Sequence, residues 1–177
     1  MKNLIAAVIF ISTVSLVTGC TGLPDDIKPV TGFDKDRYLG TWYEIARLDH
    51  SFERGLSQVS AEYILNDDCS IKVINRGYDQ ADAEWSEADG RAVFVGDDDV
   101  GHLKVSFFGP FYASYVIFEL DQNEYSYAYV TGYNRDYLWF LSRTPQVTGE
   151  ALDAFRERAE SEGFDLEELI VVDQPQL

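Results

Sequence analysis

Short segments rich in Val, Ile, Tyr, Phe and Trp follow one another from residue 39 to residue 143, and turn residues end each of them. β-Branched and aromatic side chains fit a pleated surface, so such segments are typical of β-strands. We predict eight strands, near residues 40–48, 56–66, 70–78, 84–95, 102–108, 114–120, 125–132 and 137–143. The short turns between them favour an antiparallel meander. Closing the meander removes both edges, so we expect an all-β fold, an eight-stranded up-and-down barrel.

The segment after the eighth strand has the pattern of one amphipathic helix. Thr148 is a suitable N-cap, and Gly163 is a suitable residue to follow the C-terminus. The apolar stripe between them consists of Leu152, Phe155 and Ala159. We expect this helix to pack on the outside of the barrel, with a short final strand near residues 169–172.

The first twenty residues look like the signal peptide of a bacterial lipoprotein. An uncharged apolar stretch over residues 4–17 follows Lys2, and it is too short to span a bilayer as a helix. It ends in Val17-Thr18-Gly19-Cys20, which resembles a lipobox. The resemblance implies cleavage before Cys20, a diacylglycerol on its thiol and a further acyl chain such as palmitate on its amine. The alternative is an ordinary signal peptide with an incidental cysteine.

This reading divides the chain into a signal peptide (1–19), a lipidated tether (20–31) and a barrel domain (32–177). Thr21 stands where an Asp would resemble an inner-membrane retention signal, so the outer membrane is the expected location, with the domain facing the periplasm. Two or more acyl chains anchor a protein stably where one does not. The outer membrane is therefore a predicted partner.

The net charge of −17, from 31 acidic and 14 basic residues, argues against nucleic acid as a partner. The acidic run Asp97-Asp98-Asp99 lacks the alternating spacing of a calcium loop, so we read it as a solvated turn and predict no metal site. An enzyme is not expected either. The chain has only two histidines, His50 and His102, and it has no Gly-x-Ser-x-Gly motif. We predict no catalytic residue and no cofactor.

Cys69 is the second of only two cysteines, and it lies in the turn-like run after Asn66. If Cys20 is acylated, Cys69 has no partner within the chain. A free thiol in a hairpin turn is one interpretation, and an intermolecular disulfide is the other. A homodimer through exposed aromatic side chains is also left open.

Three ordered motifs resemble the signatures of the bacterial lipocalin family, in its outer-membrane lipoprotein branch. Gly40-Thr41-Trp42 matches the Gly-x-Trp of the first strand, and Arg143 matches the arginine that ends the eighth. The run from Thr131 to Tyr137 matches the second signature loosely, because Thr131 is not followed directly by Asp. The resemblance covers roughly residues 20–175. It implies a barrel in which Gly40, Trp42 and Arg143 are structural, with the Arg guanidinium packed on the Trp ring.

The resemblance also implies that the barrel holds a small apolar ligand, such as a fatty acid, a lysophospholipid or a similar amphiphile. A structural lipoprotein with a filled barrel is the alternative, and a lipid-modifying enzyme is a third, less favoured one. By period-2 counting, Glu44 and Ala46 share the side of Trp42, while Tyr137, Trp139 and Leu141 share the side of Arg143. We expect Trp139 to face the cavity, although packing under the helix is the alternative.

Loops at the open end supply the remaining candidates. These are Phe52 and Arg54 in the loop after the first strand, Phe111 and Tyr112 after the fifth, and Arg135 after the seventh. Arg54 and Arg135 are hypothesised to meet a phosphate or carboxylate head group. Glu44 has two interpretations, as a buried carboxylate that meets the polar head of a ligand or as one partner of an ion pair with a lysine or arginine.

Overall fold

The computed structural model describes residues 21–175, so the predicted signal peptide and Cys20 lie outside the described residues. The strands are β1 Gly40–Arg47, β2 Leu56–Leu65, β3 Ile71–Asp79, β4 Glu84–Phe94, β5 His102–Phe108, β6 Phe111–Leu120, β7 Tyr127–Thr131, β8 Leu138–Ser142 and β9 Ile170–Val171. The helices are α1 Lys35–Tyr38 and α2 Gly149–Ser161. The eight predicted strands are therefore confirmed, with β6 beginning at Phe111 rather than near residue 114.

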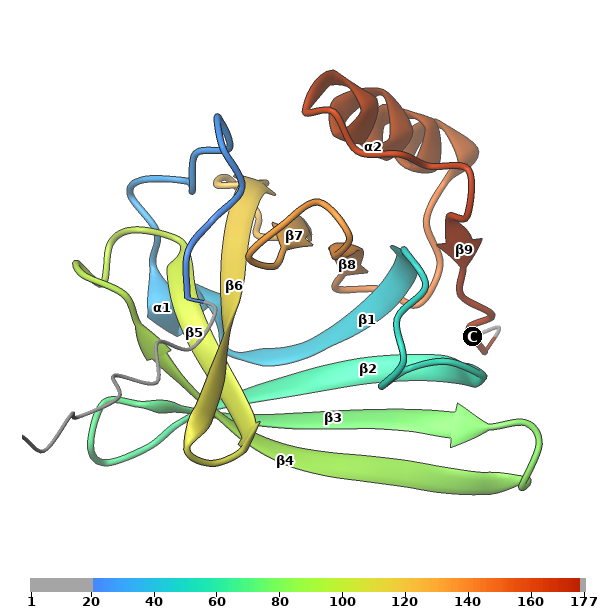
Figure 1. Cartoon of the computed structure of the whole chain (residues 1–177), viewed down its shortest axis with the longest axis horizontal. Helices are drawn as coiled ribbons and strands as arrows, with labels where there is room; N and C mark the ends of the chain where they lie inside the picture. The colour runs from blue at the N-terminus through green and yellow to red at the C-terminus, as the bar shows by residue number, and fades with distance from the viewer. Residues whose placement is uncertain (1–20, 176–177) are drawn as a thin grey trace, which may run out of the picture.

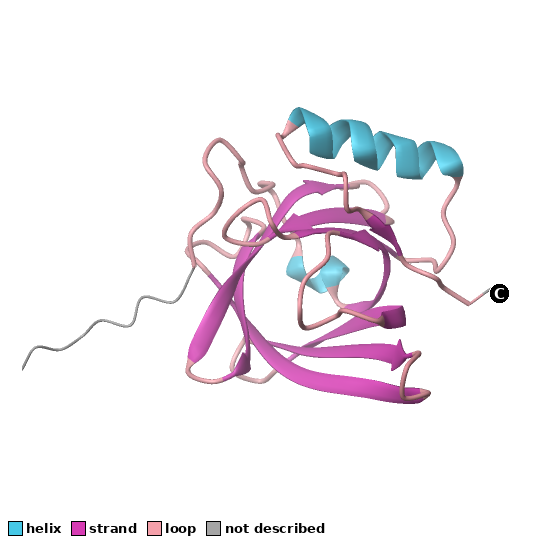
Figure 2. Cartoon of the chain, turned by 45° about the vertical axis from the view of Figure 1, so that its right-hand side comes forward, coloured by secondary structure: helices cyan, strands magenta, loops and turns pink. Residues whose placement is uncertain are grey.

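Each strand from β1 to β8 pairs antiparallel with the next, and β1 also pairs with β8. This last pairing closes the sheet into a barrel, which Figures 1 and 2 show from two sides. β9 extends the sheet outside the barrel by pairing with Ala46 and Arg47. The predicted eight-stranded barrel, with its outer helix and short final strand, is confirmed.

A β-bulge in β1 divides the side chains of this strand between two hydrophobic cores. The pairing of β1 with β8 shifts register between Glu44 and Ala46. Trp42 lies in the core inside the barrel, whereas Ile45 and Ala46 lie in a second core between the barrel and α2. Strict alternation placed Ala46 on the inner face, and this prediction is wrong because the bulge inserts one residue and reverses the alternation.

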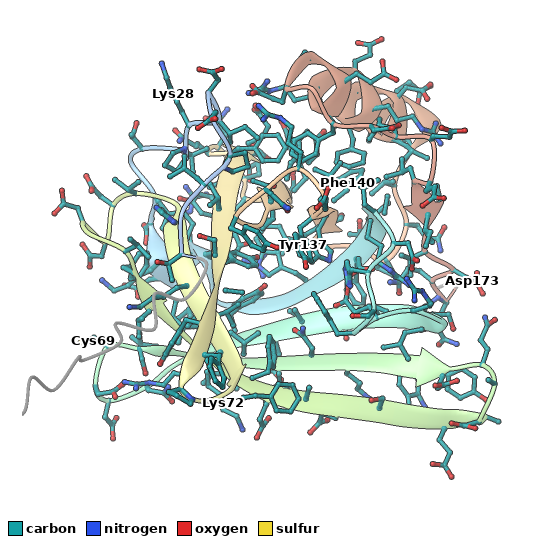
Figure 3. All side chains as sticks on the ribbon, viewed as in Figure 1. Lys28, Cys69, Lys72, Tyr137, Phe140 and Asp173 are labelled. Carbon is teal, nitrogen blue, oxygen red and sulfur yellow. The ribbon has the colours of Figure 1, made fainter. Side chains whose placement is uncertain are left out.

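The helix α2 covers the outer core, as predicted. Thr148 caps its first turn by accepting a hydrogen bond from the Ala151 amide (3.2 Å). Phe155 and Ala159 are fully buried, and the Phe155 ring lies 5.0 Å from that of Phe140. Figure 3 shows Phe140 on the α2 side of β8 and Tyr137 towards the barrel interior. Gly163 follows the helix with φ +82°, the conformation expected of a glycine after a C-terminus.

One end of the barrel is closed by α1, a short helix that the sequence analysis did not predict. In Figure 2 it lies within the ring of strands. Tyr38 at its end packs on Trp42, with ring centroids 4.7 Å apart. The Arg143 guanidinium lies 3.9 Å from the Trp42 ring centroid and donates hydrogen bonds to the carbonyls of Thr41 and Arg37. The expected cation–π contact of Trp42 and Arg143 is therefore present.

The segment before α1 is packed against β5 and β6. The Val30 amide donates to the Ile117 carbonyl (2.9 Å), and Val30 in turn accepts from the Gly101 amide (2.9 Å). Ile27 is buried in the outer core. Nearer the start, the Ser114 hydroxyl donates to the Gly22 carbonyl. Residues 22–31 are thus fixed to one side of the barrel.

The strands β3 and β4 form a long hairpin, which extends to the right in Figure 1. They pair along the whole of β3, from Ile71 with Ala92 to Asp79 with Glu84. The ladder between β4 and β5 is shorter and joins only Arg91–Phe94 to Leu103–Ser106 among the described residues. The mouth-side half of β4 is therefore an exposed edge of the barrel wall.

The turn between β2 and β3 holds Cys69 as an exposed free cysteine at the left of Figure 3, with φ +63°. The predicted place in a hairpin turn is confirmed, and an intermolecular disulfide stays a prediction. None of the helices in the described part of the chain is long and apolar enough to cross a membrane.

Candidate functional site

The inside of the barrel holds a cavity of about 670 Å³, within the range of small-molecule sites. Its wall is mostly apolar and aromatic. The expected candidates that line it are Glu44, Phe52, Phe111, Tyr112, Tyr137, Trp139 and Leu141. Further wall residues come from β2, β3 and β5, among them Val59, Ile71, Val73, Leu103 and Val105. Side chains therefore do not fill the barrel, and an apolar ligand has space inside it.

An aromatic cluster from β8 and the β1–β2 loop lies at the open end of the cavity. Tyr137 and Trp139 are stacked with centroids 6.0 Å apart. His50 lies between Phe52 (4.0 Å) and Trp139 (5.1 Å). Trp139 thus faces the cavity as expected and does not pack under the helix. Phe52 is 60% exposed, so one face of this cluster is open to a ligand or to solvent.

Glu53 fixes the β1–β2 loop to this cluster. Its carboxylate accepts a hydrogen bond from the Trp139 indole (3.1 Å) and lies 3.0 Å from His50 Nε2. Burial by itself raises the pKa of Glu53, but the contacts with His50, Trp139 and Arg47 outweigh it and lower this pKa below its ordinary value. Glu53 is therefore a buried, ionised group in the loop that covers part of the cavity.

Glu44 forms a buried ion pair with Arg47, whose Nη1 lies 2.6 Å from Glu44 Oε1. Arg47 also donates to the carbonyls of Glu53 (2.8 Å) and Leu56 (3.2 Å), which ties the loop to β1. Burial and the neighbouring Glu53 carboxylate raise the pKa of Glu44 well above its ordinary value, although Arg47 opposes the shift. Of the two interpretations of Glu44, the ion pair is confirmed, and the same side chain also lines the cavity.

The closed end of the cavity has a floor of three tyrosines. The Tyr115 hydroxyl lies 2.7 Å from that of Tyr38 and 2.8 Å from that of Tyr63. Burial raises the pKa of all three hydroxyls, so they are neutral at physiological pH. Beneath them, the Trp42 indole donates to the Tyr38 carbonyl (2.8 Å). The floor is therefore a rigid, uncharged, hydrogen-bonded layer.

Arg54 and Arg135, the two expected head-group ligands, are not in the wall of this cavity. Arg54 is exposed, and its Nε and Nη2 both donate to Oδ2 of Asp49, at 2.9 and 2.6 Å. Arg135 donates to the carbonyls of Glu162 (2.7 Å) and Asp25 (2.7 Å), which links the β7–β8 loop to the end of α2 and to the N-terminal segment. Local partners therefore hold both guanidinium groups, neither lines the cavity, and a contact of either with a head group stays a prediction.

Neither the spacing nor the alternation of residues in the sequence indicated the buried cluster of Glu44, Arg47 and Glu53 or the tyrosine floor. Arg47 reaches the interior only because the bulge in β1 reverses the alternation after Glu44. Tyr38, Tyr63 and Tyr115 come from three separate elements, so no spacing relates them. The described residues include no group of three or more His, Cys, Asp or Glu side chains placed to hold a metal ion.

Comparison with known proteins places this geometry in one family. The model of the lipocalin-like domain matches residues 33–174. The chain is 58% identical over 159 residues to the outer membrane lipoprotein Blc of Vibrio cholerae, and the aligned region covers 90% of this chain and 93% of that protein. It is 49% identical over 162 residues to Blc of Escherichia coli K12, with coverage of 90% and 91%.

The fold of insecticyanin from the tobacco hornworm agrees, with a TM-score of 0.70 at 23% identity and 88% coverage of each chain. Lipocalins of this kind are non-enzymatic proteins that bind small hydrophobic ligands, and the Blc relatives are lipoproteins of the outer membrane. The chain therefore belongs to the lipocalin family, as an outer membrane lipoprotein of the Blc type.

Proposed function

We propose that the barrel holds one single-chain amphiphile, with its acyl chain in the cavity and its head group at the aromatic mouth. The observation that supports this proposal is the cavity of about 670 Å³, whose wall combines an apolar shaft with Phe52, Tyr137 and Trp139 at the opening. Burying an acyl chain is favourable by about 0.8 kcal/mol for each CH₂ group. Acyl chains on Cys20 keep the protein at the membrane that supplies such lipids.

Within this class, the charges favour a lysophospholipid with a zwitterionic, ammonium-bearing head over a fatty acid anion. The buried carboxyl groups of the described wall are those of Glu44 and Glu53, and no buried Lys, Arg or His lines it in the described part of the chain. Arg76 contributes to the wall but is exposed, and its guanidinium lies over Trp85, 4.3 Å from the ring centroid. A carboxylate would meet acidic groups here, whereas an ammonium group can lie on aromatic faces.

Replacement of Trp139 by Ala tests the proposal. We expect affinity to fall by about tenfold or more, because a buried aromatic side chain contributes about 1.5–3 kcal/mol and tenfold corresponds to about 1.4 kcal/mol. The measurement is displacement of a fluorescent fatty acid from residues 21–177 by lysophosphatidylcholine and by palmitate. Trp85→Ala is the matched control, since Trp85 lies outside the cavity wall.

Two results would contradict the proposal. A folded protein that binds neither lipid would favour a purely structural lipoprotein. Equal loss of affinity in Trp85→Ala and Trp139→Ala would show that the probe is not in the barrel. Tighter binding of palmitate than of lysophosphatidylcholine would reject only the preference for a zwitterionic head.

A further inference from the structure

The hairpin of β5 and β6 differs in composition from the rest of this acidic chain. Residues 100–118 contain no Asp or Glu, although the chain has 31 acidic residues among 177. Lys104 is the only Lys or Arg within this stretch. Residues 100–118 therefore present no acidic group to an approaching apolar or zwitterionic surface.

Large apolar side chains are exposed at the tip of this hairpin. Phe108 is 81% exposed and Phe111 is 64% exposed, and the two residues flank the turn Gly109-Pro110. Their pairing across the turn places both rings at one site. Exposed apolar groups gathered in this way mark an interaction surface more often than scattered ones do.

The same hairpin lies next to the point where the chain leaves the barrel towards Cys20. The Ser114 hydroxyl on β6 donates a hydrogen bond to the Gly22 carbonyl. An isolated β-bridge between Thr31 and Val100 fixes the later part of the N-terminal segment. Three residues of strand separate Ser114 from Phe111, a distance of roughly 10 Å. Because Cys20 is two residues from Gly22 and a chain advances at most about 3.6 Å per residue, acyl chains on Cys20 start within about 20 Å of the hairpin tip.

Phe108 and Phe111 also line the cavity. A membrane surface that contacts the tip of the β5–β6 hairpin therefore also contacts the open end of the cavity. We propose that the tip of the β5–β6 hairpin, Phe108 to Phe111, inserts into the lipid surface that carries the anchor and so opens the cavity directly onto the bilayer. An amphiphile then passes between membrane and barrel without its acyl chain crossing water. The role in exchange rests on the proposed function, whereas the insertion itself does not.

The full-length acylated protein in phosphatidylcholine vesicles provides the test, because these vesicles carry no net charge. A polarity-sensitive fluorophore is attached to Phe108→Cys in a Cys69→Ser background, which removes the exposed native thiol. The matched control carries the fluorophore at Glu157→Cys, an exposed position on α2. We expect a blue shift and loss of iodide quenching at position 108 on transfer from detergent to vesicles, and little change at position 157.

Equal accessibility of the two labels to iodide, whether both are exposed or both are shielded, would overturn the proposal. A second measurement uses variants without a label. We expect Phe108→Asp to slow the uptake of lysophosphatidylcholine from vesicles, whereas Ile64→Asp, at an exposed position outside the cavity wall, should not. Equal uptake rates in the two variants would reject the role of the tip in exchange. Shielding at position 108 without lipid uptake in the wild type would leave insertion standing and contradict the proposed binding function.

Discussion

Glu44 and Glu53 place two carboxyl groups in one buried cluster, which Arg47 alone of the described arginines neutralises. Burying a net charge in an apolar wall is costly. The raised pKa of Glu44 reduces this cost, because the group takes up a proton more readily than an exposed carboxyl does. Glu53 stays ionised because His50 and the Trp139 indole stabilise its charge.

This assignment predicts a specific pH dependence of stability. Because the folded-state pKa of Glu44 is raised, its contribution to stability is complete below the ordinary value of about 4.5 and is lost as the pH rises through the raised pKa. We expect the free energy of unfolding to fall as the pH rises above the ordinary value of about 4.5 in the wild type, and to fall less in Glu44→Gln, which is always neutral. Urea unfolding at a series of pH values measures the free energy of unfolding of the wild type and of Glu44→Gln.

The pKa of Glu53 is shifted in the opposite direction. Its pKa is lowered, so its contribution is present above the ordinary value and is lost only as the pH falls through the lowered one. Glu53→Gln leaves Glu44 buried but removes the neighbouring carboxylate that also raises the pKa of Glu44, so the fall in stability with rising pH should be smaller than in the wild type. Identical slopes in the wild type and in Glu44→Gln would show that Glu44 does not carry the proton.

Among the elements, α2 and the outer face of β7 and β8 form a core that is separate from the cavity. Phe155 lies 4.9 Å from Tyr129 and 5.0 Å from Phe140, ring centroid to ring centroid. Ala46 lies in this core as well, because of the bulge in β1. Packing of the helix thus supports the sheet from outside and leaves the interior free for a ligand.

Replacement of Phe155 by Ala should destabilise the protein by about 3–5 kcal/mol, the usual cost of deleting a buried Phe. Chemical denaturation monitored by far-ultraviolet circular dichroism measures the change. Leu152→Ala is the control, since Leu152 is only partly buried in the same stripe and should cost less. If Phe155→Ala loses no more stability than Leu152→Ala, α2 is not packed on the barrel through Phe155.

Charge dominates the behaviour of the whole molecule. A net charge of −17 produces self-repulsion that the exposed ion pairs, such as Lys35 with Asp98, offset only in part. Exposed ion pairs contribute about 0–1 kcal/mol each. Salt weakens these pairs, but it also screens the larger repulsion between the excess acidic groups.

We therefore expect the Tm to rise with sodium chloride. The rise should come mainly as the Debye length falls from about 30 Å at 0.01 M to about 8 Å at 0.15 M. Differential scanning calorimetry at a fixed pH measures it. A Tm that falls with added salt would indicate that the ion pairs outweigh the repulsion.

The sequence by itself determined the strands, the barrel and the outer helix, because each depends on local alternation, turn residues and caps. The resemblance to the lipocalin signatures indicated the contact of Trp42 with Arg143. Period-2 alternation, which β8 follows without a break, indicated Trp139 and Tyr137 as wall residues. In these cases a residue and its neighbours along the chain carry the information.

The tertiary structure alone decided the polar chemistry of the cavity. A single bulge in β1 moved Ala46 out and brought Arg47 in, and local partners hold Arg54 and Arg135, neither of which lines the cavity. The tyrosine floor joins three distant elements, and the exposed tip at Phe108 lies beside the N-terminal segment only in the folded barrel. Such contacts depend on the register and closure of the sheet, which arise from pairing between strands far apart in the chain and leave no periodic signal in it.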